Sequence, residues 1–158
     1  MKRFTLKNLF TRSSGVKTKK DRRRKPRPAG GYNFTILIVD DSRTVVAAFT
    51  KVLRQAGFRT ITATNGIEGV TAAKAHMPDL ILMDVVMPGL NGYQATRQIR
   101  KHDATSEIPI IIVSGEQQAT EQYWGKRVGA NAFLTKPVDR AQFFEQIFET
   151  LDNKISLK

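Results

Sequence analysis

Five short runs typical of strands, four of them mainly apolar, are each followed by a segment with helical periodicity, and this alternation constrains the chain more than any other feature of its sequence. The runs cover residues 34–39, 59–63, 80–83, 109–113 and 131–134. Continuous runs of aliphatic and β-branched residues are typical of strands buried on both faces of a parallel sheet. Parallel strands need long, right-handed crossovers, which are usually helices. The alternation therefore predicts an α/β protein with a doubly wound, five-stranded parallel sheet.

The segments between these runs carry apolar residues at helical spacing. Ser42 is placed to cap the first helix, and Gly57 is placed to end it. In the second helix, Ile67, Val70 and Ala73 are expected to face the core. This second helix covers Gly66–His76. A third predicted helix follows Gly92 and ends at Lys101, and the last two cover Thr120–Val128 and Asp139–Leu151.

Charge divides the chain into two parts. Residues 1–31 hold 12 of the 26 Lys and Arg residues and one of the 14 acidic residues, so their net charge is +11, whereas residues 32–158 carry +1. Low hydrophobicity combined with high net charge keeps a segment from burying enough surface to fold. Pro and Gly residues at the end of this segment are typical of a linker. We therefore expect a basic, disordered tail over residues 1–31 and one folded domain over residues 32–158.

Composition removes several classes of protein and of site. The chain has no cysteine and two histidines, which excludes disulfide scaffolds and thiolate metal sites and argues against a histidine-rich metal site. No apolar run approaches the ~18 residues of a membrane-spanning helix. No apolar segment of the kind found in secretory signals is present, although the tail shares its Arg-rich, acid-poor composition with transit peptides.

Polar residues follow four of the five predicted strands. Asp40 and Asp41 follow the first, Asp84 the third, Ser114 the fourth and Lys136 the fifth. Because ligands of open α/β sheets bind at the carboxyl ends of the strands, we expect these side chains to meet. Three carboxylates in one cleft repel one another, and oxygen ligands alone favour Mg²⁺ as the cation that relieves the repulsion. A lysine and a hydroxyl suit phosphoryl oxygens, so the set indicates phosphoryl transfer.

Each of these residues taken singly has an ordinary structural explanation. Adjacent acids favour a helix N-terminus, an aspartate before a Pro-Gly loop suits a turn, and single lysines are mostly solvated. The functional interpretation rests on their occurrence together at four strand ends.

Four motifs, in this order, resemble the receiver domain of two-component response regulators across residues 34–151. They are Ile38-Val39-Asp40-Asp41-Ser42, the segment 83–92, Ser114-Gly115 and Leu134-Thr135-Lys136-Pro137. The resemblance implies a flavodoxin-like fold with strand order 2-1-3-4-5 and helices on both faces. Segment 83–92 with its continuation to Ile99, and Trp124–Arg127, are similar to the stand-alone regulators of twitching motility, which act in a chemotaxis-like pathway controlling type IV pili.

Carried over by position, the resemblance makes Asp84 the phosphoacceptor. Asp41 then binds Mg²⁺ directly, Asp40 assists directly or through water, and the backbone carbonyl of Val86 contributes a further metal ligand. Lys136 is expected to bind the phosphoryl group.

The resemblance also assigns residues that respond to phosphorylation. Ser114 is expected to move toward the phosphoryl group on activation. Phe133 matches the aromatic switch position; because it has no hydroxyl, a switch there must act through burial of the ring, and a plain core aromatic is the alternative. Val86 and Glu116 occupy positions that tune dephosphorylation.

The family resemblance further implies a cytoplasmic protein that takes its phosphoryl group from a histidine kinase and signals by protein–protein contact. The output face would be formed by the predicted helix 120–128, the strand 131–134 and the helix 139–151. Such a protein catalyses its own phosphotransfer and dephosphorylation and no other reaction. Because the chain ends seven residues after Leu151, we expect no C-terminal effector or DNA-binding domain.

Two alternatives stay open at this point. Phosphatases of the haloacid-dehalogenase type also combine an aspartate nucleophile, a hydroxyl, a lysine and Mg²⁺, but in a D-x-D arrangement, whereas Asp40 and Asp41 are adjacent. The tail is a solvated extension, or it binds an anionic inner membrane, an acidic partner protein or, in a salt-sensitive manner, nucleic acid. Since no base-reading element accompanies the charge, the membrane or an acidic partner is preferred.

Overall fold

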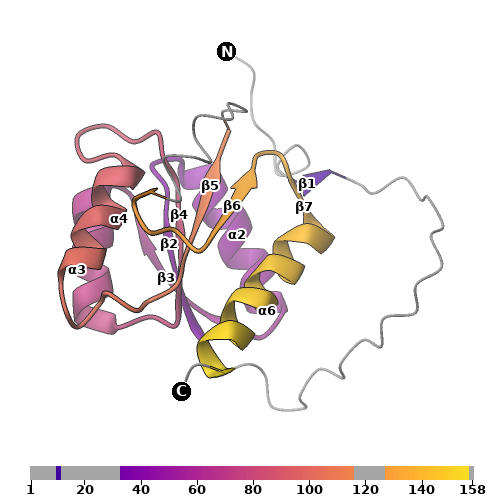
Figure 1. Cartoon of the computed structure of the whole chain (residues 1–158). Coiled ribbons are helices and arrows are strands. Elements are labelled where there is room, and N and C mark those ends of the chain that lie inside the picture. Colours follow the sequence, from indigo (N-terminus) through magenta and orange to yellow (C-terminus); the bar gives the residue numbers. More distant parts are fainter. Residues whose placement is uncertain (1–9, 12–32, 116–126, 157–158) are drawn as a thin grey trace.

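The computed structural model describes residues 10–11, 33–115 and 127–156, and within them a parallel sheet flanked by helices (Figure 1). The sheet has the order β3-β2-β4-β5-β6. Its strands are β2 (Thr35–Val39), β3 (Arg59–Ala63), β4 (Leu80–Met83), β5 (Ile110–Ser114) and β6 (Ala132–Thr135). All four pairings are parallel, which confirms the predicted fold and the predicted 2-1-3-4-5 order.

Helices cover both faces of this sheet (Figure 1). They are α2 (Arg43–Gln55), α3 (Gly66–His76), α4 (Gly92–Lys101) and α6 (Arg140–Ser156). The second and third agree with the predicted bounds, whereas α6 continues five residues beyond the predicted end at Leu151. The predicted helix 120–128 lies largely outside the described residues.

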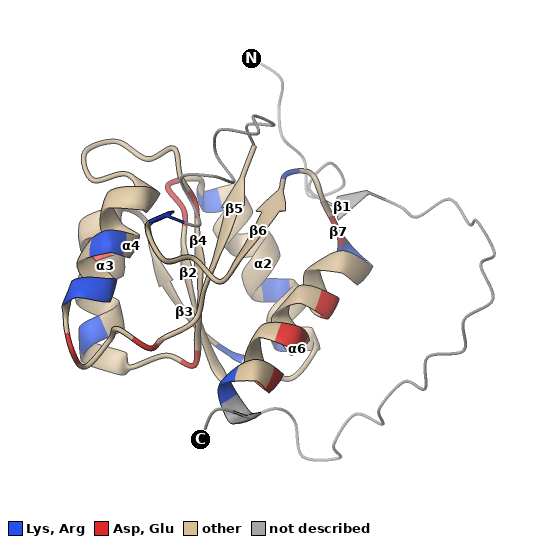
Figure 2. Cartoon of the chain, in the orientation of Figure 1, with Lys and Arg blue, Asp and Glu red and all other residues tan. Residues whose placement is uncertain are grey.

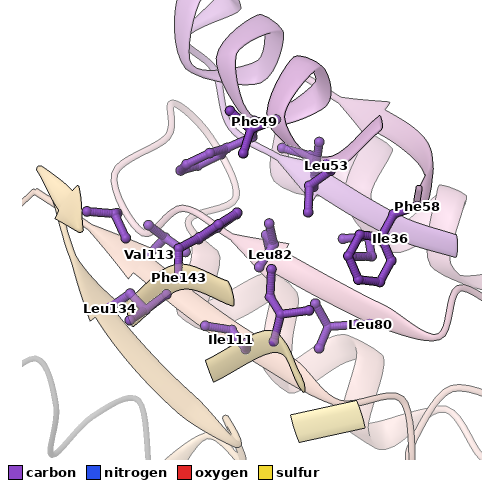
Figure 3. Packing of buried hydrophobic residues seen from close by; sticks show 14 of the residues in the cluster. Ile36, Phe49, Leu53, Phe58, Leu80, Leu82, Ile111, Val113, Leu134 and Phe143 are labelled. Carbon is purple, nitrogen blue, oxygen red and sulfur yellow. The ribbon is translucent and has the colours of Figure 1, made fainter. Parts of the chain in front are cut away.

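Strands β2, β4 and β5 are apolar over most of their length because each face of the sheet has its own core. On β2, Ile36 and Ile38 belong to a cluster with α2 and α6, whereas Leu37 and Val39 belong to a cluster with α3 and α4. Figure 3 shows the first cluster, in which aromatic and aliphatic side chains of the sheet and the helices interdigitate. Within it the rings of Phe49 and Phe143 stack, with an interplanar angle of 11° and centroids 5.0 Å apart.

The residues predicted to bound α2 act as expected, whereas the capping pair at the start of α4 was not predicted. The Ser42 side chain accepts a hydrogen bond from the backbone N–H of Val45 and so caps α2. Gly57, with φ of 97°, ends the helix in the left-handed conformation that glycine adopts without steric cost. At α4, Asn91 and Gln94 form a reciprocal capping box.

The prediction that Ile67 faces the core is wrong. Ile67 is 67% exposed, and the buried residues of α3 are instead the stripe of Gly66, Gly69, Val70 and Ala73. At ~100° per residue, Ile67 lies about 110° from the centre of that stripe. Gly69 lets the helix approach closely, because a Cβ there would meet the side chain of Val39.

Two short strands lie outside the five-stranded sheet. Strand β1 (Phe10–Thr11) pairs in parallel with β7 (Val138–Asp139), which joins β6 to α6 (Figure 1). No pattern in the sequence predicts this pairing. For the other residues of 1–31, the absence of regular structure stays a prediction. Among the described residues, no helix has the length and apolarity needed to cross a membrane.

Truncation of Phe143 should strongly destabilise the domain. The side chain is fully buried and stacks on Phe49, so Phe143→Ala should lower the free energy of unfolding by about 3–5 kcal/mol. Urea denaturation followed by circular dichroism measures the effect. The exposed Ile67 supplies the control, since Ile67→Ala should change stability by no more than about 0.5 kcal/mol. Equal effects of the two variants would contradict this description of the core.

Candidate functional site

The ends of β2 and β4 bring three carboxylates together. Asp40 and Asp41 follow β2, and Asp84 follows the adjacent β4, where its N–H donates to the carbonyl of Val39. Each carboxylate offers one oxygen, and these three oxygens lie within 4.8 Å of one another. The predicted convergence of these side chains is thus present in the structure.

Asp40 is the best anchored of the three acids. Its side chain is almost fully buried, and one carboxylate oxygen accepts a hydrogen bond from the backbone N–H of Ser42 at 2.9 Å. The other oxygen accepts from Nζ of Lys136 at 2.7 Å. Asp41, by contrast, is exposed, so its carboxylate is open to a ligand from solvent.

Lys136 reaches the same cluster from the other side of the site. Its Nζ lies 3.3 Å from Oδ1 of Asp84 as well as 2.7 Å from Asp40, and it therefore bridges the two buried acids. Its backbone N–H donates to the carbonyl of Ser114 at 2.7 Å, which fixes the end of β6 against β5. Figure 2 shows acidic positions beyond the ends of β2 and β4, at the edge of the sheet where β6 also ends.

The pKa of Asp84 is raised from 3.8 to about 6. Burial is the largest cause, because it disfavours the charged form, and the negative charges of Asp40 and Asp41 add to it. The charge and hydrogen bond of Lys136 act in the opposite direction. The carboxylate is therefore mostly ionised at neutral pH but repelled by its neighbours, a state that a cation stabilises.

The loop after Asp84 is held close to the site by a glycine that the sequence analysis treats only as part of a motif. The N–H of Gly92 donates to the carbonyl of Val85, and a Cβ at Gly92 would collide with the backbone carbonyl of Asp84. The sequence marks the position within segment 83–92, but the contact that requires glycine becomes visible only in the fold. Within this loop the side chain of Val86 is 58% exposed beside the acids.

The remaining predicted residues lie at different distances from this cluster. Ser114 is fully buried at the end of β5, opposite Thr135 of β6. Phe133 is half-buried on β6, where it packs against the cluster under α3 and α4. Glu116 lies outside the described residues.

The donor set fits Mg²⁺. Hard cations that bind through oxygen prefer carboxylates, and three carboxylate oxygens from neighbouring strands are available at one point. Cysteine and histidine do not contribute to this group. Asp40, Asp41 and Asp84 are thus the residues that could hold the ion.

In the metal-free protein, the ionised Asp84 carboxylate should lower the free energy of unfolding at neutral pH. Its pKa is raised, so between pH 3.8 and about 6 the folded state binds more protons than the unfolded state, and stability falls as pH rises. Asp84→Asn should therefore stabilise the metal-free protein at pH 7 by about 2 kcal/mol, from ~1.4 kcal/mol per pKa unit reduced for partial exposure.

Urea denaturation in EDTA at a series of pH values measures this difference. The extra stability of the Asp84→Asn variant over wild type should disappear below pH 3.8, where the wild-type carboxyl is protonated in both the folded and the unfolded state. A gain that is equal at low and neutral pH would contradict the assigned cause.

Comparisons with known proteins agree with this site. The family model of the response regulator receiver domain matches residues 36–148. Protein PilH of Pseudomonas aeruginosa is 51% identical over 112 residues, which cover 71% of this chain and 93% of PilH.

Two solved structures share both the fold and part of the sequence. One is the receiver domain of a sensor histidine kinase from P. aeruginosa with a magnesium ion coordinated in its active-site cleft; it is 30% identical, has a TM-score of 0.71, and the match covers 77% of this chain and 99% of that one. The other is a CheX–CheY complex of Borrelia burgdorferi with BeF₃ and Mg²⁺, at 30% identity and a TM-score of 0.69, covering 73% and 87%. The family model, which spans most of the folded domain, and these likenesses establish that the chain belongs to the response regulator receiver family.

Proposed function

We propose that this protein is a single-domain response regulator that accepts a phosphoryl group on Asp84 and signals through phosphorylation-dependent protein contact. The observation that carries the proposal is the bridge of Lys136 between Asp40 and Asp84, beside the exposed Asp41. This arrangement gives one acidic group to receive the phosphoryl group, two acids to hold a cation and one ammonium to bind phosphoryl oxygens.

The chemistry required of Asp84 is nucleophilic attack on phosphorus. One carboxylate oxygen forms the new P–O bond while the P–N bond of a phosphohistidine donor breaks, and the product is an acyl phosphate. The attacking group must be ionised, which the pKa of about 6 allows at neutral pH. In this step the protein acts on itself and is not a catalyst for an external substrate.

A bound Mg²⁺ supplies neutralisation of the charge that gathers between carboxylates and phosphoryl oxygens. Asp41 and Asp84 would hold it, with Asp40 assisting and the backbone carbonyl of Val86 as a further ligand. Asp40 keeps its place through the N–H of Ser42, so it stays oriented when Lys136 turns toward the phosphoryl group.

The response to phosphorylation is assigned to β5 and β6. Ser114 and Lys136 are joined through backbone atoms, so movement of one side chain toward the phosphoryl group is transmitted to the strand that carries Phe133. Phe133 is half-buried and can therefore move to a more buried or a more exposed position. Dephosphorylation would be tuned by Val86, whose exposed side chain flanks the site, and by Glu116.

A histidine kinase is the proposed donor, and the proposed output face combines the helix 120–128, β6 and α6. The CheX–CheY complex of B. burgdorferi supports contact between a receiver domain of this kind and a second protein. The identity to PilH, which the match covers almost completely, supports a chemotaxis-like pathway that controls type IV pilus twitching motility. We infer a cytoplasmic location from the identity to PilH. Contact of the basic tail with the inner membrane or with an acidic partner protein is a separate proposal, which rests on the net charge of +11 in residues 1–31. The family match disfavours the phosphatase alternative.

Phosphorylation at Asp84 should be directly observable. Incubation with acetyl phosphate and Mg²⁺ should add one phosphoryl group in intact-mass spectra, and EDTA should prevent it. Asp84→Asn should abolish the product, whereas the exposed Asp103→Asn should be labelled as wild type is. Labelling of the Asp84 variant in equal yield would overturn the assignment.

Removal of Asp41 should separate metal binding from folding. Asp41→Ala should weaken Mg²⁺ binding by about tenfold or more, because one charged ligand is lost. The metal-free variant should be as stable as wild type or more so, since Asp41 adds to the repulsion at Asp84. Calorimetric titration and thermal melts with and without Mg²⁺ measure both effects, with Asp103→Ala as the control. A metal-free Asp41 variant that melts well below wild type would show a structural role.

A further inference from the structure

Strand β7 owes its strand character to the N-terminal extension. In the part of the chain that the structure describes, its pairing partner is β1, with Phe10 opposite Val138 and Thr11 opposite Asp139. More than 120 residues of sequence separate the two strands, so the pairing is a tertiary contact and not a local turn. Figure 1 shows β1 beside β7, where the chain passes from β6 into α6.

The two residues of β7 lie between two fixed points. On one side, the N–H of Lys136 is bound to the carbonyl of Ser114. On the other side, the Asp139 carboxylate accepts from the N–H of Gln142 and so holds the first turn of α6. The Val138 side chain is fully buried in the core. The backbone edge of β7 is thus the part of this connection that is left to pair with an additional strand.

Phosphorylation requires a change close to this connection. In the structure, Nζ of Lys136 is held by Asp40 at 2.7 Å and by Asp84 at 3.3 Å. To bind a phosphoryl group on Asp84, the lysine must give up at least part of these contacts. The backbone two residues later, at Val138, is paired with β1.

We propose that β1 is an intramolecular ligand of β7 that restrains the Lys136 segment in its unphosphorylated arrangement. The N-terminal extension then acts as a regulatory strand and not only as a carrier of charge. The inference rests on the proposed phosphorylation of Asp84 and adds a control of its rate. Because coupling between two sites is reciprocal, a phosphoryl group on Asp84 also weakens the pairing of β1 with β7.

The decisive variant breaks the pairing without changing charge. Proline at both positions, Phe10→Pro with Thr11→Pro, removes both N–H donors of β1 in the full-length protein. The control, Val16→Pro with Thr18→Pro, adds the same number of prolines outside β1. Deletion of residues 1–31 forms a third protein, which also removes the net charge of +11.

Two measurements are made on these three proteins and on wild type. Hydrogen exchange of the metal-free proteins reports on the backbone amides of residues 138–140, where the β1 variant should exchange at least about threefold faster than wild type. The initial rate of labelling by acetyl phosphate at fixed Mg²⁺ should rise by about threefold or more in the β1 variant and in the deletion. The control variant should behave as wild type in both measurements.

Loss of the strand and loss of the positive charge should change the initial labelling rate in opposite directions. A basic tail that acted only by attracting the anionic donor would leave the β1 variant at the wild-type rate and would slow the deletion, and this result would overturn the proposal. Unchanged exchange at residues 138–140 would also overturn it. Absence of any label on wild-type Asp84 would instead defeat the proposed function, together with the control that rests on it.

Discussion

The bond of Lys136 to Asp40 is the interaction on which the site depends. Two carboxylates are buried at the ends of neighbouring strands, and burial of charges without partners is costly. The ammonium of Lys136, on a side chain only 16% exposed, compensates this charge at 2.7 Å from Asp40 and 3.3 Å from Asp84. Since Lys136 follows β6, the compensation links the first and the last strand of the five-stranded sheet in chain order. At 3.3 Å, Lys136 compensates the charge of Asp84 less completely. Burial and the charges of Asp40 and Asp41 therefore keep the pKa of Asp84 raised.

Much of the fold is predictable from sequence because its signals are local. Ser42 and Gly57 mark the ends of α2, and the fully apolar character of segments such as 80–83 requires cover on both faces of a parallel sheet. The geometry of parallel strands also predicts that Asp40, Asp84 and Lys136 share one edge, because each follows a strand that runs in the same direction. Chain order and strand direction suffice for such placements.

The features that could not be predicted depend on contacts between distant segments. The stripe that buries Gly66 and Gly69 leaves Ile67 in solvent, because close helix packing favoured the small residues over the apolar one. Lys136 lies closer to Asp40 than to Asp84, at 2.7 Å against 3.3 Å, and a difference this small depends on packing that sequence does not reveal. The β1–β7 pairing carries no periodic signal, since a two-residue strand has no period to detect. Glu116 and most of the predicted helix 120–128 stay predictions.

The place of each functional residue in the hydrogen-bond ladders of the sheet has a mechanical consequence. The strands that precede the acids, β2 and β4, are bonded to neighbours on both sides, so the backbone at Asp40 and Asp84 is held by two hydrogen-bond ladders. Strand β6 ends the sheet within the described residues and is bonded on one side only. It can shift by breaking one ladder rather than two. The acids therefore follow strands that are paired on two sides, whereas Phe133 lies on, and Lys136 follows, a strand that is paired on one side. Under the proposed function, β6 is thus the strand that phosphorylation of Asp84 displaces at the smallest loss of hydrogen bonds.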